Sequence, residues 1–341
     1  MSTVNANILA TTTEKINKGI IDQVLMPNPL FARLLMKKTA PWDGGTSLEY
    51  IIQTANTDDL VQTYKPTDQL TAARKTVLTR AKFYWKYANA QISYDVEDEL
   101  QNRGDSAIEN LTDRLADIAM ESMRIKLTKV AYGIDTPNET SDSGTDFQSI
   151  PEALDHSRAY GGITSDTGDN AYWNGASLAG TYSDRNTAVS CSLSTVRQAI
   201  STVRKYAKTP GSLLAITSPT NHLNLKSQLE AMNAYSQQGS KLAKFGFDSF
   251  MLDGVEHVPD YYLTGSQTIN GSSDTLDTWY FLLNTDHIEL RLHPKRNFKI
   301  TKMVWQGDRA NGYDQWLGRI LIAGNLICYK PNGSLWLSNM S

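Results

Sequence analysis

The chain has 341 residues and a formal net charge of −3, from 33 Lys and Arg against 36 Asp and Glu. This balance excludes the overall positive excess with which proteins that bind free nucleic acid neutralise phosphates, although it leaves room for one basic face. Hydrophobic residues make up 40% and charged residues 20%, which excludes a disordered chain and is enough for about two domains of ~100–200 residues.

Residues 1–41 begin with a polar arm that lacks the basic and apolar regions of a secretory signal. The apolar segment Ile20–Met36 follows and is interrupted by Pro27-Asn28-Pro29. Because prolines stop a continuous helix, we expect only a short helix over Leu30–Lys38. Nowhere in the chain does an apolar run approach the ~20 residues of a membrane span, so we expect a soluble protein without a membrane partner.

The stretch from Gly44 to Lys75 is poor in large apolar residues after Tyr50-Ile51-Ile52 and rich in Thr, Asp, Gln, Asn and Lys through Asp68. Such a stretch cannot bury enough apolar surface to hold itself in a core. Lying between two ordered elements, it predicts a long projecting hairpin or loop. Loops of this length are typically functional or bound by another molecule.

From Val77 to Tyr94 the hydrophobic period is two, which predicts one long amphipathic strand. Strands in compact sheets average ~5–6 residues, so we expect this one to extend beyond a single domain. The expected apolar face carries Val77, Ala81, Phe83, Trp85 and Tyr87, and the polar face carries Arg80, Lys82 and Lys86.

A long helix is expected over residues 105–132. Ser106 and Glu109 form a capping box, Asp105 adds negative charge at the same end, and Gly133 suits the position after the helix. One apolar stripe must pack against a sheet or another helix. Its expected members are Ile108, Leu111, Leu115, Ile118, Ser122 and Ile125.

The second half mixes helices and strands, which makes the expected class α+β. Residues 134–190 are rich in Gly, Ser, Thr, Asp and Asn, and no internal repeat occurs. Later periodic segments predict, in order, a helix over 193–208, a strand over 213–216, a helix over 219–235, strand structure over 279–292, a strand over 320–329 and a turn at Pro331-Asn332-Gly333.

No catalytic signature is found. The nearest approach to a nucleophile elbow, at Ser177, has Ala179 where the tight turn requires glycine. The five histidines include no pair at helical metal-binding spacing. The acidic loops 142–146 and 166–170 resemble calcium sites but lack the terminal glutamate, and turn chemistry explains them more simply.

Two further features are expected to be structural. Cys191 and Cys328 are too far apart in the sequence for a metal knuckle or disulfide framework, which predicts a reduced, intracellular chain with two buried or half-buried thiols. A small basic cluster beside Phe298 is more simply a solvated strand face than a nucleic-acid site. It consists of Lys295, Arg296, Lys299 and Lys302.

The order of these elements resembles the major capsid (coat) proteins of tailed bacteriophages, whose fold is shared with encapsulin shells. Tyr160-Gly161-Gly162-Ile163 followed by Trp173 is similar to a segment of one branch of phage coat proteins, as are the preceding Phe147, Pro151, Leu154 and Asp155. The stretch Leu326–Leu335 looks like the closing strand of the family, with Lys330 where Asn is usual.

The resemblance implies an N-terminal arm, an E-loop, a P (peripheral) domain with a spine helix, and an A (axial) domain. In the family, the arm and the E-loop reach over adjacent subunits. The implied ranges are arm 1–41, E-loop hairpin 42–76, P domain 77–133 with spine helix 105–132, A domain 134–284, returning P-domain strands 285–330 and C-terminal segment 331–341.

The implied function is a non-enzymatic structural protein that forms hexamers and pentamers of an icosahedral head around double-stranded DNA. No cofactor or metal is implied. The expected partners are other copies of the chain, a portal protein, a separate scaffolding protein and DNA held by weak, non-specific contacts. The expected location is the virion capsid, assembled in the bacterial host cytoplasm. The expected subunit-interface residues are Tyr50, Leu60, Tyr64, Lys65, Asp68, Arg74 and Lys75.

The sequence also departs from some family members. About 40 residues precede the E-loop and they lack heptads, whereas some relatives carry a longer scaffolding segment there; with a start at Met1, this favours a separate scaffold. Some relatives crosslink through a Lys–Asn isopeptide bond. Lys65 and Lys75 lie in the expected E-loop, but nothing local marks either as reactive.

Two alternatives remain open. An encapsulin-like cargo shell has the same fold and differs in its cargo. A carbohydrate-binding or hydrolytic protein is suggested by the seven tryptophans, although no pair of catalytic carboxylates stands out around them. These tryptophans are Trp42, Trp85, Trp173, Trp279, Trp305, Trp316 and Trp336.

Overall fold

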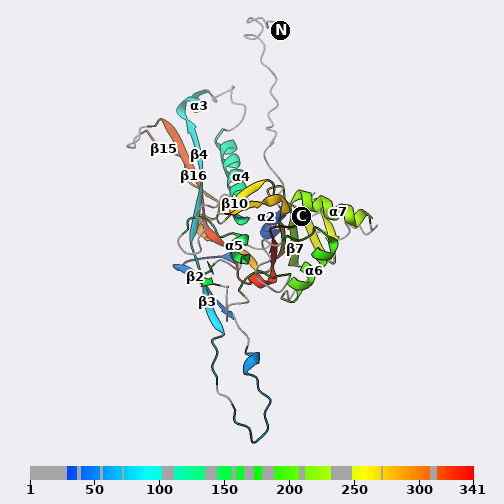
Figure 1. Ribbon diagram of the computed structural model, residues 1–341. Helices are drawn as coiled ribbons and strands as arrows, with labels where there is room; N and C mark the ends of the chain where they lie inside the picture. The colour runs from blue at the N-terminus through cyan, green and yellow to red at the C-terminus, as the bar shows by residue number, and fades with distance from the viewer. Residues whose placement is uncertain are drawn as a thin grey trace.

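Most of the chain is described by a computed structural model (Figure 1). Several expected features lie outside the described residues. These are residues 1–28, the capping box at Ser106 and Glu109, the acidic loop 166–170 and part of the loop 142–146. Among the residues it does describe, no helix is long and apolar enough to cross a membrane. The described ranges are 29–36, 40–53, 57–70, 73–101, 111–134, 144–155, 159–164, 173–178, 188–206, 212–231, 248–269, 272–307 and 313–341.

Helices and strands alternate along the chain, which confirms the expected α+β class. A short helix stands where one was expected near residue 30, and helices follow the expected positions in the second half. The helices are α2 (Pro29–Met36), α3 (Val96–Gln101), α4 (Leu111–Ala131), α5 (Ile150–Leu154), α6 (Leu193–Arg204) and α7 (Pro219–Ala231).

A six-stranded sheet is built around the long strand β16 (Gln315–Cys328). One edge of β16 pairs antiparallel with β4 (Lys86–Asp95), from Gln315 opposite Asp95 to Gly324 opposite Lys86. The other edge of β16 pairs antiparallel with three strands, one after another along its length. A short strand pairs parallel with the first of the three. These are β13 (Ile288–Leu292), β14 (Lys299–Ile300) and β15 (Val304–Trp305), with β1 (Ala40–Pro41) beside β13.

A five-stranded sheet forms the other half of the body, with α6 and α7 on one face (Figure 1). Its other face carries Phe281 and Trp336 into the main core, which explains why every residue of its central strands is buried. Its strands, in spatial order, are β17 (Leu335–Leu337), β12 (Tyr280–Asn284), β7 (Leu213–Thr217), β9 (Val255–Pro259) and β8 (Phe250–Leu252). The C-terminal segment therefore belongs to this sheet through β17.

The strand structure expected over 279–292 is divided between the two sheets. β12 lies in the five-stranded sheet and β13 in the six-stranded one, with a turn at 285–287 between them. Thr285 N–H donates to the Ser212 carbonyl at 3.0 Å and His287 N–H to the Asn284 carbonyl at 3.0 Å, which fixes this turn. The expected alternation of Ile288, Leu290 and Leu292 on a buried face is confirmed.

The helix α4 ends as expected and packs differently from expectation. Gly133 has a φ of +71°, and its N–H and that of Ile134 donate to Val130 and Lys129, which is the Schellman ending. The expected stripe through Ile118 and Ser122 is wrong, since both are exposed. The buried stripe is rotated around the helix and comprises Ala119, Met123, Leu127 and Val130.

The single strand expected over Val77–Tyr94 is two strands, β3 (Leu78–Tyr84) and β4, separated by Trp85. Ala81 and Phe83 are buried as expected, but after Trp85 the alternation inverts: Lys86 is 2% exposed and Tyr87 61%. The expectation that Tyr87 is on the buried face and Lys86 on the polar face is wrong. The chain changes partner strands at Trp85, which rotates the following residues by one position.

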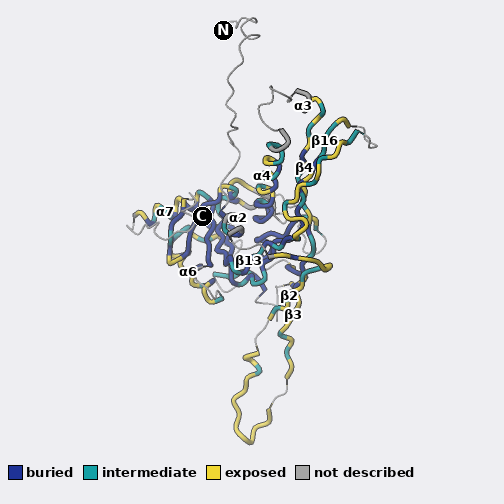
Figure 2. The backbone as a smooth tube through the Cα atoms, turned by 180° about the vertical axis from the view of Figure 1, so that it is seen from behind, coloured by how far each residue is buried: buried dark blue, intermediate teal, exposed yellow. Residues whose placement is uncertain are grey.

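Three two-stranded hairpins complete the fold. They are β2 (Ser47–Gln53) with β3, β5 (Ala159–Tyr160) with β6 (Ile163–Thr164), and β10 (Ser266–Ile269) with β11 (Ser272–Thr275). Figure 2 shows the buried residues concentrated in the two sheets and their helices, and exposed residues along the β2–β3 projection.

Gly324 is the position in the core sheet where a side chain is least tolerable. A Cβ there would lie 2.0 Å from the Arg291 carbonyl oxygen, which belongs to the neighbouring strand β13. We expect Gly324→Ala to lower the free energy of unfolding by about 3 kcal/mol or more, because the backbone of β13 must move. Urea unfolding measures this, with Gly44→Ala as control, since no atom lies within 4 Å of a Cβ at Gly44. An unchanged midpoint for Gly324→Ala would contradict this register.

Candidate assembly surfaces

The hairpin β2–β3 carries a long loop away from the body (Figure 1). We refer to residues 57–70 and 73–77 as the projecting loop. Most of these residues are exposed, and their one regular element is a short 3-10 turn at Asp58–Leu60. The loop therefore holds its shape with little support from the core, and its side chains are available to other molecules.

The residues expected at a subunit interface occupy different parts of this hairpin. Tyr50 lies at its base, half-buried, with its ring 6.0 Å from that of Phe83 and 5.9 Å from that of Tyr329. Leu60 and Lys75 are partly covered within the loop. Tyr64, Lys65, Asp68 and Arg74 are exposed.

The loop has internal polar contacts that shape its tip. Asp68 N–H donates to the Lys65 carbonyl at 2.9 Å, and Lys65 N–H donates to the Asp68 carboxylate at 2.8 Å. Pro66 at the second position suits such a turn. Lys75 pairs with Asp59 at 3.2 Å across the loop, a partly exposed contact that contributes only about 0–1 kcal/mol.

Exposed apolar side chains occur along the hairpin, and only Tyr64 among them was expected at the interface from the sequence. The exposed fractions are 76% for Val61, 73% for Ile51, 62% for Tyr64, 58% for Leu78 and 57% for Leu70. Because five such side chains lie on this one hairpin, it is a candidate contact surface. β-Strand alternation could have identified Ile51 and Leu78, because their neighbours in each strand face the core.

Two tryptophans fix the base of the hairpin. The rings of Trp42 and Trp85 stack with centroids 3.6 Å apart, and Trp85 Nε1 donates to the Gly45 carbonyl at 2.8 Å. Trp42 is 3% exposed and donates to the Gly44 carbonyl at 2.9 Å. This clamp joins the chain entering the hairpin to the chain leaving it, and so sets the direction of the projection.

We expect Trp85→Ala to loosen the hairpin while the two sheets stay folded. The stack contributes about 0.5–1.5 kcal/mol beyond the area it buries, and its loss frees both ends of the hairpin. Hydrogen exchange measures this effect: amides of β2 and β3 should exchange faster, and those of β7 and β12 at the original rate. Equal acceleration in all four strands would show that Trp85 acts on the whole fold instead.

The Tyr-Gly-Gly-Ile motif at residues 160–163 contacts the body end of the β2–β3 hairpin. Gly161 and Gly162 have φ values of +59° and +75°, as a tight two-residue hairpin turn requires. Gly161 O accepts from Lys82 N–H of β3 at 2.9 Å, and Tyr160 OH accepts from Cys328 N–H of β16 at 2.8 Å. Trp173 Nε1 donates to the Tyr160 carbonyl at 2.9 Å. The motif thus links β3 to β16.

A second exposed apolar area lies on the six-stranded sheet, where β14 and β15 pair with β16. Its side chains include Ile300, Val304 and Trp305, at 50%, 45% and 40% exposed, and Tyr313 at 63%. The four cations of the basic cluster are exposed beside it. Of these cations only Lys299 lies on a strand, since Lys295 and Arg296 lie in the 3-10 turn Pro294–Arg296 and Lys302 lies outside the strands, so the expected strand face is wrong for three of the four.

In the described part of the chain, no group of three or more His, Cys, Asp or Glu side chains is placed to hold a metal ion. Cys191 is half-buried and Cys328 buried, as expected. Burial raises the pKa of the Cys191 thiol to about 11 and that of Cys328 to about 12, so both are protonated and unreactive near neutral pH.

Four of the seven tryptophans are buried and so cannot line a sugar groove. Trp42, Trp173, Trp279 and Trp336 are at most 5% exposed, and the last two pack edge to face at 5.1 Å in the core. Packing therefore explains most of the tryptophans, which removes the main argument for a carbohydrate-binding protein.

Comparison with solved structures identifies the fold. The capsid asymmetric unit of Cyanophage A-1(L) is similar with a TM-score of 0.71 and 13% identity, covering 99% of each chain. The capsid of Myoviridae Phage XM1 gives a TM-score of 0.57 and 11% identity over 99% of each chain. An encapsulin complex from Synechococcus elongatus PCC 7942 gives 0.51 and 10%, covering 100% of this chain and 97% of that one.

These matches extend over nearly the whole chain, so the protein has the fold of tailed-phage capsid proteins and encapsulins, as the resemblance implied. Protein-family models and curated proteins give no match to the sequence. At identities this low, the likeness establishes the fold, and the function has to be argued from the surfaces.

Proposed function

We propose that this chain is the major capsid protein of a tailed bacteriophage, a non-enzymatic subunit that assembles into hexamers and pentamers of an icosahedral head. The observation that carries the proposal is the full-length structural similarity to the capsid subunit of Cyanophage A-1(L). The exposed apolar side chains of the projecting loop, Val61, Tyr64 and Leu70, support it, because an assembled shell would cover them.

In this proposal the projecting loop is the E-loop, and Tyr64, Lys65, Asp68 and Arg74 meet a neighbouring subunit. The six-stranded sheet with α4 corresponds to the P domain, and the five-stranded sheet with α6 and α7 to the A domain. Residues 1–41 are the proposed arm. The proposed partners are a separate scaffolding protein, a portal protein and double-stranded DNA in weak contact. Assembly takes place in the host cytoplasm, and the mature location is the virion.

An encapsulin-like cargo shell is less favoured. The similarity to the encapsulin is weaker than that to the cyanophage capsid, and most of the similar structures are phage or phage-like capsids. The two functions differ in what the shell encloses, so particle contents distinguish them.

The experiment is chromatography with light scattering, and electron microscopy of the same fractions, on the chain produced alone and with candidate scaffold proteins from the same genome. We expect capsomers, tubes or closed shells. Closed shells that form without scaffold and retain a host protein as cargo would favour the encapsulin function. A monomer under every condition would contradict both.

A further inference from the structure

Among the described residues, the strand β4 is paired along one edge and free along the other. In the described part of the chain, β16 is the strand that pairs with β4, and it lies along one side from Lys86 to Asp95. Val96 N–H donates to the Asp314 carbonyl, which places the hydrogen-bonding groups of every second residue on the β16 side. The N–H and C=O groups of the residues between them point the other way. Those residues are Tyr87, Asn89, Gln91 and Ser93.

The pairing on the far side of β16 agrees with this alternation. Thr301 N–H donates to the Arg319 carbonyl at 2.8 Å and Gln306 N–H to the Gln315 carbonyl at 2.9 Å. Odd-numbered residues of β16 thus face β14 and β15, and even-numbered residues face β4. The outer edge of β4 therefore offers a row of backbone donors and acceptors.

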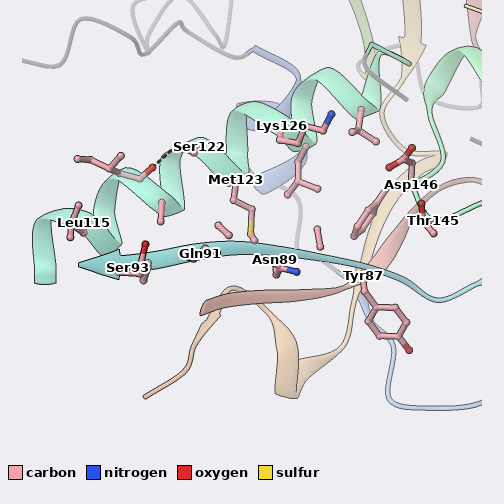
Figure 3. Close-up of a pocket in the computed structure, with 18 residues that line it drawn as sticks. Tyr87, Asn89, Gln91, Ser93, Leu115, Ser122, Met123, Lys126, Thr145 and Asp146 are labelled. Atoms are coloured by element: carbon pink, nitrogen blue, oxygen red, sulfur yellow. Dashed lines mark hydrogen bonds between the residues drawn. The ribbon is translucent and has the colours of Figure 1, made fainter. Parts of the chain in front are cut away.

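A groove runs along this edge (Figure 3). It has a volume of about 480 Å³ and is lined by the consecutive residues 87–93 of β4, by one side of α4 and by residues 145–147. Consecutive strand residues line a groove together only where its wall includes the strand edge as well as a face. Leu115, Ile118 and Ser122 contribute from α4, and Ile118 is 49% exposed.

The projecting loop carries a segment suited to this groove. Val61 has extended backbone angles, φ −79° and ψ 119°, and residues 61–65 belong to no helix or strand. Val, Thr and Tyr favour strands, and Val61 and Tyr64 are exposed. The loop leaves the body at the end away from α4 and the outer part of β4 in both views, so it cannot enter the groove of its own chain (Figures 1 and 2).

We propose that residues 61–65 of one copy add as a strand to the outer edge of β4 of a second copy, in the groove beside α4. This rests on the proposed shell function and specifies one of its contacts. Main-chain hydrogen bonds supply the attachment, and the alternating side chains supply the fit. Val61 and Thr63 fit the side of the groove lined by Ala88 and Ala90, where small side chains leave room. The contact joins unlike surfaces, so it is head-to-tail and repeats around a ring.

Disulfide trapping tests the pairing in assembled shells. Gln91→Cys is combined in turn with Gln62→Cys and Tyr64→Cys, whose side chains alternate with those of Val61 and Thr63 and so lie on the same face as Gln91, where opposite side chains of paired strands approach closely enough to bridge. Tyr64→Cys with Asn224→Cys is the matched control, since Asn224 is exposed on α7. We expect at least one Gln91→Cys combination to give covalent multimers about tenfold or more above the control, because docking raises the effective concentration of the thiols.

The outcomes separate this contact from the proposed function. Shells that form without a bridge in either combination would overturn the strand addition and leave the capsid function standing. Bridging of Ile8→Cys to Gln91→Cys in their place would also overturn it, because the N-terminal segment would then occupy the groove. Failure of every variant and of the original chain to form shells would count against the function itself.

A proline variant tests the free edge independently. Because the N–H of Gln91 points away from β16, Gln91→Pro removes a donor that the β4–β16 pairing does not use. We expect loss of shell formation with a melting temperature close to that of the original chain, and normal shells from Gln91→Ala. Normal assembly of a folded Gln91→Pro protein would contradict the proposal.

Discussion

Replacing Val61 and Tyr64 together with aspartate is expected to abolish shell assembly and leave the subunit folded. Both side chains are exposed, at 76% and 62%, so in the free subunit the new carboxylates remain hydrated. In the proposed shell, a neighbouring subunit covers the same positions. Burying an unpaired carboxylate costs several kcal/mol, and the cost recurs at every copy of the contact.

Light scattering measures the assembly, and circular dichroism with thermal melting measures the fold. A control with the same added charge is Ser194→Asp with Asn224→Asp, on exposed positions of α6 and α7. We expect this control to assemble. Shells of normal size from the Val61 and Tyr64 variant would mean that the loop does not hold neighbouring subunits together.

The second large effect expected is loss of stability in acid, through two histidines buried against the five-stranded sheet. His222 on α7 is 2% exposed, and burial lowers its pKa to about 4, against the opposing effect of Asp248, 3.7 Å away. His257 on β9 lies between the rings of Phe250 and Tyr280, and burial lowers its pKa to about 3. Both are neutral in the folded protein near pH 7.

The sign of this pH dependence follows from the number of protons that the folded and the unfolded protein each bind. In the unfolded chain both histidines bind protons below their ordinary pKa of about 6.5, whereas in the folded protein they stay neutral until the pH falls to their lowered values. The contribution of the two neutral histidines to the free energy of unfolding is therefore complete near neutral pH, and it decreases as the pH falls below about 6.5. From about pH 7 to pH 4.5 the two together lose about 5 kcal/mol.

Asp260 has the opposite effect on stability, because its carboxyl group stabilises the folded protein as the pH falls. It is buried, accepts a hydrogen bond from Tyr132 OH at 2.7 Å, and burial raises its pKa to about 6. Because the folded state then binds a proton more readily than the unfolded one, acidification recovers about 2 kcal/mol over the same range. The net expectation is a loss of about 3 kcal/mol.

Urea unfolding at the two pH values measures this loss. His222→Gln and His257→Gln should each flatten the pH dependence, and Asp260→Asn should steepen it. Equal free energies of unfolding at both pH values in the original chain would show that the histidines are not held neutral by the fold.

The hydrophobic pattern of the sequence predicted structure and burial correctly where a helix or strand packs one face against a single core. The residues Leu193, Val196, Ile200 and Val203 recur at helical spacing and are all buried in α6. The apolar strand around Leu213–Ile216 and the glycine ending of α4 are equally local signals. In each case the nearest neighbours in sequence determine the structure.

The same pattern gave wrong predictions where the chain passes from one sheet to another and pairs with different strands. The alternation inverts at Trp85 because β3 and β4 belong to different sheets, and the segment 279–292 divides at a turn for the same reason. The stripe of α4 is set by the position of β4, so Met123 and Leu127 are buried and Ile118 is not. Such choices depend on contacts between residues distant in sequence.

The candidate surfaces were predictable in outline. Poverty in apolar residues indicated that the segment from Gly44 to Lys75 projects from the body. It could not indicate that Val61 and Leu70 are exposed within it, because an apolar residue in a polar stretch is equally compatible with an anchor on the core. The free edge of β4 could not be predicted at all, since it depends on which strand lies beside it.

The most direct test of the account is a cryo-electron-microscopy reconstruction of the particles that this chain forms. The account predicts shells of hexamers and pentamers in which residues 57–70 of each subunit lie on the neighbouring subunit. Particles in which this loop contacts only its own subunit would contradict the proposed assembly role of the loop. A chain that remains monomeric with every candidate scaffold would contradict the capsid function as a whole.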